Sequence, residues 1–182
     1  MSEISSGAFA SNNHFALMGF EPRFAIDVAA LESSWHKLQK EFHPDRYAQA
    51  SEAERRRALQ IAMQINDAYQ MLKSPLNRAQ YLLSLAGVDV KTEASVRLPP
   101  DFLMKQMEWR EAIEQAVVQK DMPGLEGLMQ AVVREQVQMQ EKLADLLDCA
   151  QDIPAAAQAV RQWMFFAKLQ DEIDDAQISL ES

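Results

Sequence analysis

The chain of 182 residues has one cysteine, Cys149, and only five glycines and seven prolines. A single cysteine excludes an intrachain disulfide and a Cys-x-x-Cys metal site. The three histidines are too scattered to build a metal site with it. Because glycine and proline are the usual interrupters of helices, their scarcity favours long helices. These absences predict a helix-rich, all-α chain that holds no metal.

Several other sequence features are missing. No apolar run is long enough to cross a membrane, and residues 1–13 carry neither the basic nor the apolar segment of a secretory signal. We therefore expect a flexible leader and a cytoplasmic protein. Glycine-rich phosphate loops, Ser/His/Asp or Cys/His arrangements and convergent carboxylate pairs are also missing. The chain is accordingly not expected to be an enzyme or to need a cofactor.

The net charge of −9 is carried by the second half of the chain. Residues 1–86 hold nine basic and nine acidic side chains, whereas residues 87–182 hold nine basic and eighteen acidic ones. A neutral half and an acidic half disfavour binding to nucleic acid or to an anionic membrane, because both depend on neutralising phosphates. The uneven distribution indicates two modules.

The first module is organised around a break between two amphipathic helices. Apolar residues recur at steps of three and four on both sides of His43-Pro44-Asp45. Pro44 cannot continue the first helix, so the two helices form a hairpin with His43 and Asp45 exposed at its tip. Asp27 and Ser51 are the expected N-caps. The apolar residues are Val28, Leu31, Trp35, Leu38 and Phe42, then Leu59, Ala62, Ile65, Tyr69 and Leu72.

This arrangement resembles a J domain, the module that docks on DnaK-type chaperone ATPases and stimulates their ATP hydrolysis. The matching features are the His-Pro-Asp tripeptide between two helices and the basic exposed side of the first helix. Arg46 stands where many relatives have lysine, which keeps the charge. A chance turn beside a solvated helix face is the alternative. The residues that the resemblance implies in ATPase activation are His43, Pro44, Asp45, Lys37, Lys40 and Arg46.

A short apolar helix over residues 76–85, with Gly87 as its C-cap, is predicted to follow the hairpin. So apolar a helix should pack against its neighbours and hold the two modules at a fixed angle. We therefore expect a J domain with its following helix over residues 14–87. Residues 88–100, which end in two prolines, are expected to be a connector.

Residues 101–182 are predicted to form an antiparallel three-helix bundle. Pro123 and Pro154 fall in the first turns of the second and third helices, where proline is favoured, and Asp101 is the expected N-cap of the first. One face of the first helix is expected to point toward the core. It consists of Phe102, Gln106, Trp109, Ile113, Ala116 and Val117.

A second apolar face lies on the other side of this helix. Leu103, Met104 and Met107 share it with Glu108 and Glu111. Such a helix is either buried all round or offers a binding patch, and full burial is hard to achieve among three helices. Methionine is common on partner-binding surfaces. We therefore predict an exposed binding patch.

The third helix contains four consecutive apolar residues, Trp163 to Phe166. Consecutive residues point in different directions around a helix, so one of the four is expected to be exposed. From its expected proximity to the patch on the first bundle helix, Phe165 is predicted to be that residue.

The order of segments resembles the HscB family, the J-type co-chaperones of iron–sulfur cluster assembly. Arg78-Ala79-Gln80-Tyr81-Leu82-Leu83 is similar to the segment after that family's J domain, and residues 102–111 are similar to the start of its C-terminal bundle. The similarity spans residues 14–178. Relatives often have glutamate in place of Gln80 and leucine in place of Trp109. The leader lacks the cysteine zinc motif of some eukaryotic members, which implies a bacterial-type, metal-free member.

The resemblance implies that the bundle binds an iron–sulfur scaffold protein of the IscU type. It also implies that the J domain recruits a dedicated DnaK-type chaperone of the HscA type. Two alternatives stay open: a general J-type co-chaperone for unfolded clients, and a helical adaptor without any chaperone role. The residues that the resemblance places at the scaffold contact are Leu103, Met104, Met107, Glu108, Glu111 and Phe165.

Overall fold

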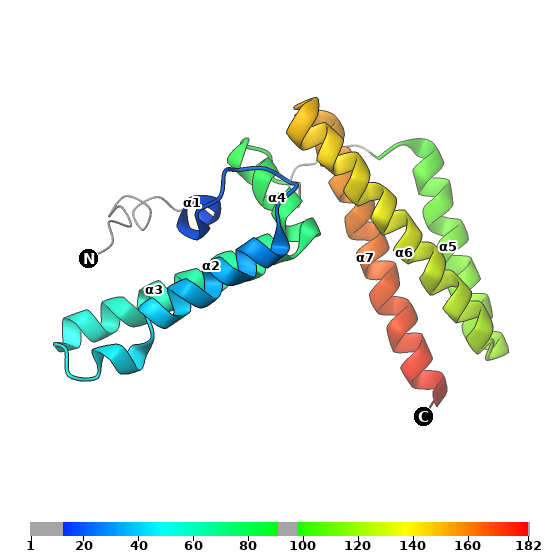
Figure 1. The fold of residues 1–182 in the computed structure, drawn as a ribbon. Helices are drawn as coiled ribbons and strands as arrows, with labels where there is room; N and C mark the ends of the chain where they lie inside the picture. Colours follow the sequence, from blue (N-terminus) through cyan, green and yellow to red (C-terminus); the bar gives the residue numbers. More distant parts are fainter. Residues whose placement is uncertain (1–12, 91–97, 182) are drawn as a thin grey trace. The chain divides into compact units, whose positions relative to one another are not determined.

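The computed structural model describes residues 13–90 and 98–181, and within these ranges the chain is helical and contains no strand (Figure 1). The all-α prediction is confirmed. The chain divides into two compact units, Met1–Leu82 and Leu83–Ser182, and the dividing point falls inside the fourth α-helix. None of the described helices is long and apolar enough to cross a membrane. The predicted leader, except Asn13, and most of the predicted connector lie outside the described residues.

The first unit is built on the predicted hairpin. Helices α2 and α3 pack against each other, α1 lies against both, and a 3₁₀ turn, η1, follows α2 (Figure 1). The α4 helix adds Tyr81 and Leu82 to the same core. The bounds are α1 His14–Met18, α2 Val28–Glu41, η1 Pro44–Tyr47, α3 Glu52–Lys73 and α4 Pro75–Leu85.

The caps predicted for α2, α3 and α4 are present. The Asp27 carboxylate accepts the first free N–H groups of α2, and Ser51 and Glu54 form a reciprocal capping box at the start of α3. The hydrogen bonds from Ser51 hold the pKa of Glu54 below its usual value. After α4, Gly87 adopts a φ of +83°, a left-handed conformation that glycine adopts without strain.

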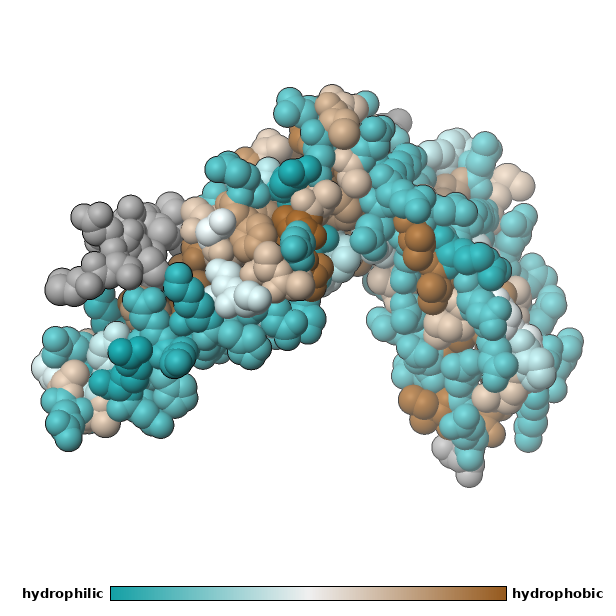
Figure 2. All heavy atoms as spheres, in the orientation of Figure 1, coloured by the Kyte–Doolittle hydropathy of each residue, from teal (hydrophilic) through white to brown (hydrophobic). Residues whose placement is uncertain are grey.

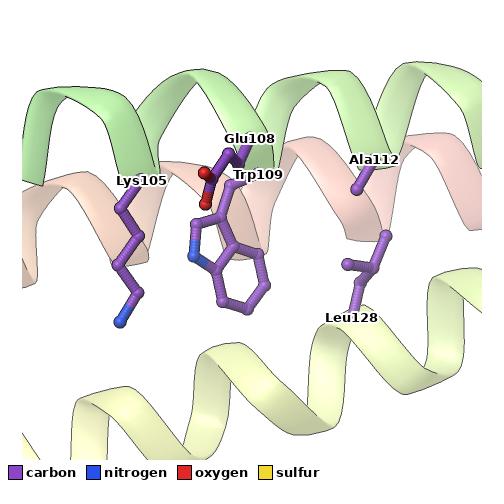
Figure 3. A pocket seen from close by; sticks show the side chains of 5 residues that line it. All are labelled: Lys105, Glu108, Trp109, Ala112 and Leu128. Carbon is purple, nitrogen blue, oxygen red and sulfur yellow. The ribbon is translucent and has the colours of Figure 1, made fainter.

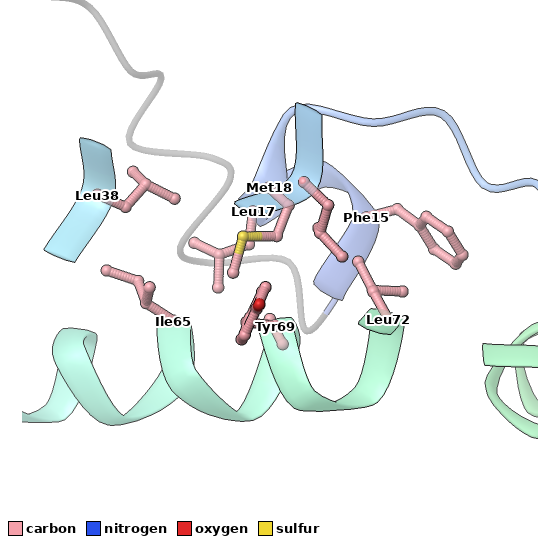
Figure 4. Packing of buried hydrophobic residues seen from close by; sticks show 9 residues of the cluster. Phe15, Leu17, Met18, Leu38, Ile65, Tyr69 and Leu72 are labelled. Carbon is pink, nitrogen blue, oxygen red and sulfur yellow. The ribbon is translucent and has the colours of Figure 1, made fainter. Parts of the chain in front are cut away.

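The core of the first unit is a cluster of apolar side chains from α1, α2 and α3. Figure 4 shows Phe15, Leu17 and Met18 of α1 meeting side chains of the hairpin helices. A polar contact also fixes the hairpin, because Asn66 on α3 accepts hydrogen bonds from Trp35 Nε1 at 3.0 Å and from Gln39 Nε2 at 2.5 Å. The register of α2 against α3 is thus set by apolar packing and by these two hydrogen bonds to Asn66.

The second unit is the predicted three-helix bundle. Helix α5 spans Pro100–Gln119, α6 spans Met122–Ala144 and α7 spans Ile153–Glu181, with a π-helical turn, η2, over Asp145–Cys149. Each helix packs on the other two. Pro123 and Pro154 occupy first turns as predicted, because the N–H that proline lacks has no partner there.

Two details of α5 differ from expectation. Asp101 is not its N-cap: the helix begins at Pro100, and Pro99 occupies the cap position without a side-chain hydrogen bond. Proline at the first helical position has the required φ and no N–H to satisfy, so no capping side chain is needed for that residue. Val117, predicted on the core face, is 37% exposed near the end of the helix.

Candidate functional site

The His-Pro-Asp tripeptide forms the start of η1, directly after α2. His43 has an extended backbone (φ −62°, ψ 132°), as expected before proline, and its Nδ1 accepts the Asp45 backbone N–H at 3.4 Å. The Arg46 N–H then donates to the His43 carbonyl oxygen at 3.0 Å. The tip of the predicted hairpin is therefore a short turn whose backbone is fixed by hydrogen bonds.

The His43 and Asp45 side chains at the tip face solvent. The Asp45 side chain is 91% exposed and the His43 side chain 54% exposed, with 3.6 Å between His43 Nδ1 and an Asp45 carboxylate oxygen. Because Nδ1 is turned toward the Asp45 side of the turn, Nε2 is the ring nitrogen available to a partner. The predicted exposure of both residues is confirmed.

A basic depression adjoins the tip. Its lining consists of His36, Gln39, Lys40, His43 and Arg46. The Arg46 Nη1 donates to the Lys40 carbonyl oxygen at 3.2 Å, so the guanidinium folds back over the end of α2. Gln39, which sequence reasoning missed, links this depression to α3 through its bond to Asn66. Lys37 is exposed on α2 but is not part of the lining.

The predicted binding patch on α5 is exposed. Leu103 is 49%, Met104 65% and Met107 73% exposed, and both Glu108 and Glu111 lie at the surface beside them. On the face seen in Figure 2, much of the surface is hydrophilic, with brown and tan hydrophobic areas between the teal residues. The α5 patch places three large exposed apolar side chains within five residues of one helix, which is a concentrated apolar surface.

Phe165 is buried, which corrects the expectation that it is exposed. Only 8% of the residue is exposed, and its ring packs edge-on against Phe102 and Phe166 with centroids 5.6 Å apart in each case. The Arg110 guanidinium lies 5.9 Å from its centroid. Because α5 and α6 both pack on α7, this apolar run finds neighbours on several sides. Phe165 lies against α5 instead of protruding beside it.

A groove between α5 and α6 was not predicted. Figure 3 shows Lys105 and Trp109 pointing from α5 toward α6, and Leu128 pointing from α6 toward Ala112. Glu108 also lines the groove. Trp109, expected in the core, is half-buried here. The short side chain of Ala112 leaves room for the groove, but only the packing of α5 on α6 places Ala112 opposite Leu128.

The described residues contain no group of three or more metal-binding side chains. Cys149 is exposed, with its thiol free.

A family model described as the HSCB C-terminal oligomerisation domain matches residues 98–174. A co-chaperone protein HscB homolog from Azoarcus sp. (strain BH72) is 48% identical over 170 residues, covering 93% of this chain and 96% of the relative. The chain belongs to the HscB family. A second HscB homolog, from Bordetella avium (strain 197N), is 44% identical over 90% of this chain and 96% of the relative. The predicted family is thereby confirmed, and these relatives are named as co-chaperones, not as enzymes.

Solved structures of HscB proteins have the same fold. The chaperone HscB from Vibrio cholerae superposes with a TM-score of 0.80 at 40% identity, covering 92% of this chain and 99% of that one. Human co-chaperone protein HscB has a TM-score of 0.85 at 24% identity, over 92% of this chain and 83% of the human one. The predicted J domain and C-terminal helical bundle are therefore the architecture of an HscB co-chaperone.

Proposed function

We propose that this HscB-family chain is a cytoplasmic adaptor for iron–sulfur cluster assembly. Its C-terminal bundle binds an IscU-type scaffold protein, and its J domain recruits an HscA-type chaperone of the DnaK class and stimulates that chaperone's ATPase. The observation that carries the proposal is the exposed apolar patch of Leu103, Met104 and Met107 in the domain that matches the family model.

The J-domain tip acts through charge and hydrogen bonding. Asp45 presents an almost fully exposed carboxylate, which is suited to an arginine of the ATPase. His43 offers Nε2 as a second polar contact, and Pro44 fixes the backbone between the two residues. Lys40 and Arg46 line the adjoining depression, with Lys37 exposed on the same helix, so this side attracts an acidic surface of the chaperone.

The bundle acts mainly through apolar burial. Leu103, Met104 and Met107 expose side chains that gain free energy when a partner removes them from water. Glu108 and Glu111 are the polar rim that orients the scaffold. The family resemblance also assigns Phe165 to this contact. Phe165 packs against Phe102 of α5 and can contribute only its small exposed edge.

One chain that carries both surfaces makes delivery possible. A scaffold bound to the bundle is held near the client site of a chaperone bound to the J domain, which raises its effective concentration there. The stimulated ATPase then favours the chaperone state that holds its client tightly. Tight capture of the scaffold loosens the cluster for transfer to acceptor proteins and so supports maturation of iron–sulfur proteins.

The test is the steady-state ATPase rate of the HscA-type partner with scaffold alone, with this chain alone and with both. The proposal predicts stimulation by the chain and a further, more than additive increase when the scaffold is present. Stimulation without this synergy would support a general J-type co-chaperone. An unchanged rate in all three mixtures would overturn the co-chaperone role and leave a helical adaptor.

A further inference from the structure

The groove between α5 and α6 has largely apolar walls. The Trp109 indole and the Ala112 methyl group come from α5, and the Leu128 side chain comes from α6 (Figure 3). Trp109 and Leu128 are only half-buried, so part of each side chain remains accessible from the groove. An elongated apolar group would bury this surface, as in other concave binding sites.

The charges around the groove are unequal. Lys105 stands at one end, but its Nζ pairs with Glu135 Oε1 on α6 at 2.6 Å, so its positive charge is compensated. Glu108 also lines the groove and is exposed, and no side chain among the described residues pairs with it. The groove therefore combines apolar walls with one uncompensated negative charge.

We propose that this groove is a subsite of the scaffold-binding surface and takes a lysine or arginine side chain of the scaffold. The inference rests on the proposed function. The apolar stem of the basic side chain lies on Trp109 and Leu128, and its charged end pairs with Glu108. A purely apolar side chain fits less well, because it would cover the Glu108 carboxylate without giving it a partner.

Continuity with the patch identifies the occupant. Glu108 belongs both to the groove and to the patch of Leu103, Met104 and Met107, so a protein that covers the patch also reaches the groove entrance. The half of the chain that contains this unit, residues 87–182, has nine basic and eighteen acidic side chains. Its field therefore favours a basic partner surface.

The first test fills the groove. Ala112→Met places a longer side chain in the groove and leaves the patch residues unchanged. It is expected to weaken scaffold binding about tenfold by calorimetry, with an unchanged or higher unfolding midpoint. Val118→Met is the matched control, because Val118 lies on the same helix, is 77% exposed and does not line the groove. That variant should bind like the parent chain.

The second test concerns the charge. Glu108→Gln is expected to weaken binding about fivefold at low ionic strength and less at high ionic strength. Both substitutions act on the same basic side chain of the scaffold. The fold-loss of scaffold affinity in the double variant Glu108→Gln with Ala112→Met should therefore be clearly smaller than the product of the two single fold-losses. Full additivity, or an Ala112→Met variant of unchanged affinity, would overturn the assignment.

A third measurement uses the unmodified chain. The indole N–H resonance of Trp109 should shift when the scaffold binds, and an unshifted resonance would also overturn the assignment. An error in the groove assignment can be distinguished from an error in the proposed function. If Leu103→Ala with Met107→Ala weakens binding and Ala112→Met does not, only the groove assignment falls. If the parent chain does not bind the scaffold, both fall.

Discussion

The J-domain tip and the bundle patch are two exposed surfaces built in opposite ways. The tip is polar, and its side chains extend from a short turn held by backbone hydrogen bonds. The patch is apolar, and its residues extend from the first turns of a regular helix, α5, whose other face is in the core. In the tip, His43 and Asp45 depend on local turn geometry. In the patch, Met107 depends only on the position of α5.

This difference suits two kinds of contact. Charged groups in high dielectric add little to affinity but guide association and orientation, which fits a transient encounter with an ATPase. Apolar side chains gain free energy in proportion to the area removed from water, which fits holding a scaffold through an ATPase cycle. The following substitutions test whether the two surfaces are as separate as this account requires.

The largest expected effect is at the tip. Asp45→Asn removes the negative charge and keeps the shape, so stimulation of the partner ATPase should fall to the basal rate. Scaffold affinity should stay within about twofold, because Asp45 is not in the bundle. Glu32→Gln, which changes an exposed carboxylate on α2, is the control and should stimulate normally. Normal stimulation by Asp45→Asn would show that the tip does not act through this carboxylate.

The second expected effect is a difference in stability between a core variant and a patch variant of the bundle. Phe165→Ala should lower the free energy of unfolding by about 3 kcal/mol, because it removes a buried ring from the core. Met107→Ala should change it by less than about 0.5 kcal/mol, since Met107 is 73% exposed. Urea denaturation of the two variants measures both values. Equal stabilities would contradict the burial of Phe165.

The third expected effect is on the affinity for the scaffold. Leu103→Ala combined with Met107→Ala should weaken scaffold binding at least about tenfold, with ATPase stimulation in the absence of scaffold unchanged. Ile178→Ala removes an exposed apolar side chain from the end of α7 and serves as the control. Calorimetry on the double variant decides the location of the patch, and an unchanged affinity would place the scaffold contact elsewhere.

The smallest expected effect is on the pH dependence of stability in the J domain. Burial lowers the pKa of His14, against an opposing effect of Asp67. The folded state therefore binds the proton less readily than the unfolded state, whose histidine pKa is about 6.5. Stability should fall as the pH is lowered from about 7.5 to about 5.5, and this dependence should weaken in His14→Gln. Urea midpoints at the two pH values measure it, and an equal dependence in both proteins would contradict the assignment.

Much of this architecture could be predicted from local sequence signals. Asp27 and Ser51 stand directly before two stretches with helical periodicity, and they cap helices α2 and α3. Pro44 cannot continue a helix, and α2 ends shortly before it. The exposure of Leu103 and Met107 could be predicted because they lie on a different face of α5 from Phe102 and the other core residues. These features depend on residues close together in the chain, which a sequence displays directly.

The features that could not be predicted depend on neighbours distant in the chain. Phe165 is buried because two other helices pack on α7, and periodicity does not show how many neighbours a helix has. The groove depends on Ala112 facing Leu128, and the compensation of Lys105 depends on Glu135 in another helix. Such contacts require the relative register of α5 and α6, which the sequence does not display.

Delivery of the scaffold requires both surfaces on the same chain. Asp45→Asn keeps the patch, whereas Leu103→Ala with Met107→Ala keeps the tip, so an equal mixture of the two variants contains both surfaces on separate molecules. The most direct measurement is the partner ATPase rate of this mixture in the presence of the scaffold. Delivery by one chain predicts stimulation by the intact tip without synergy. Synergy equal to that of the parent chain would contradict the account.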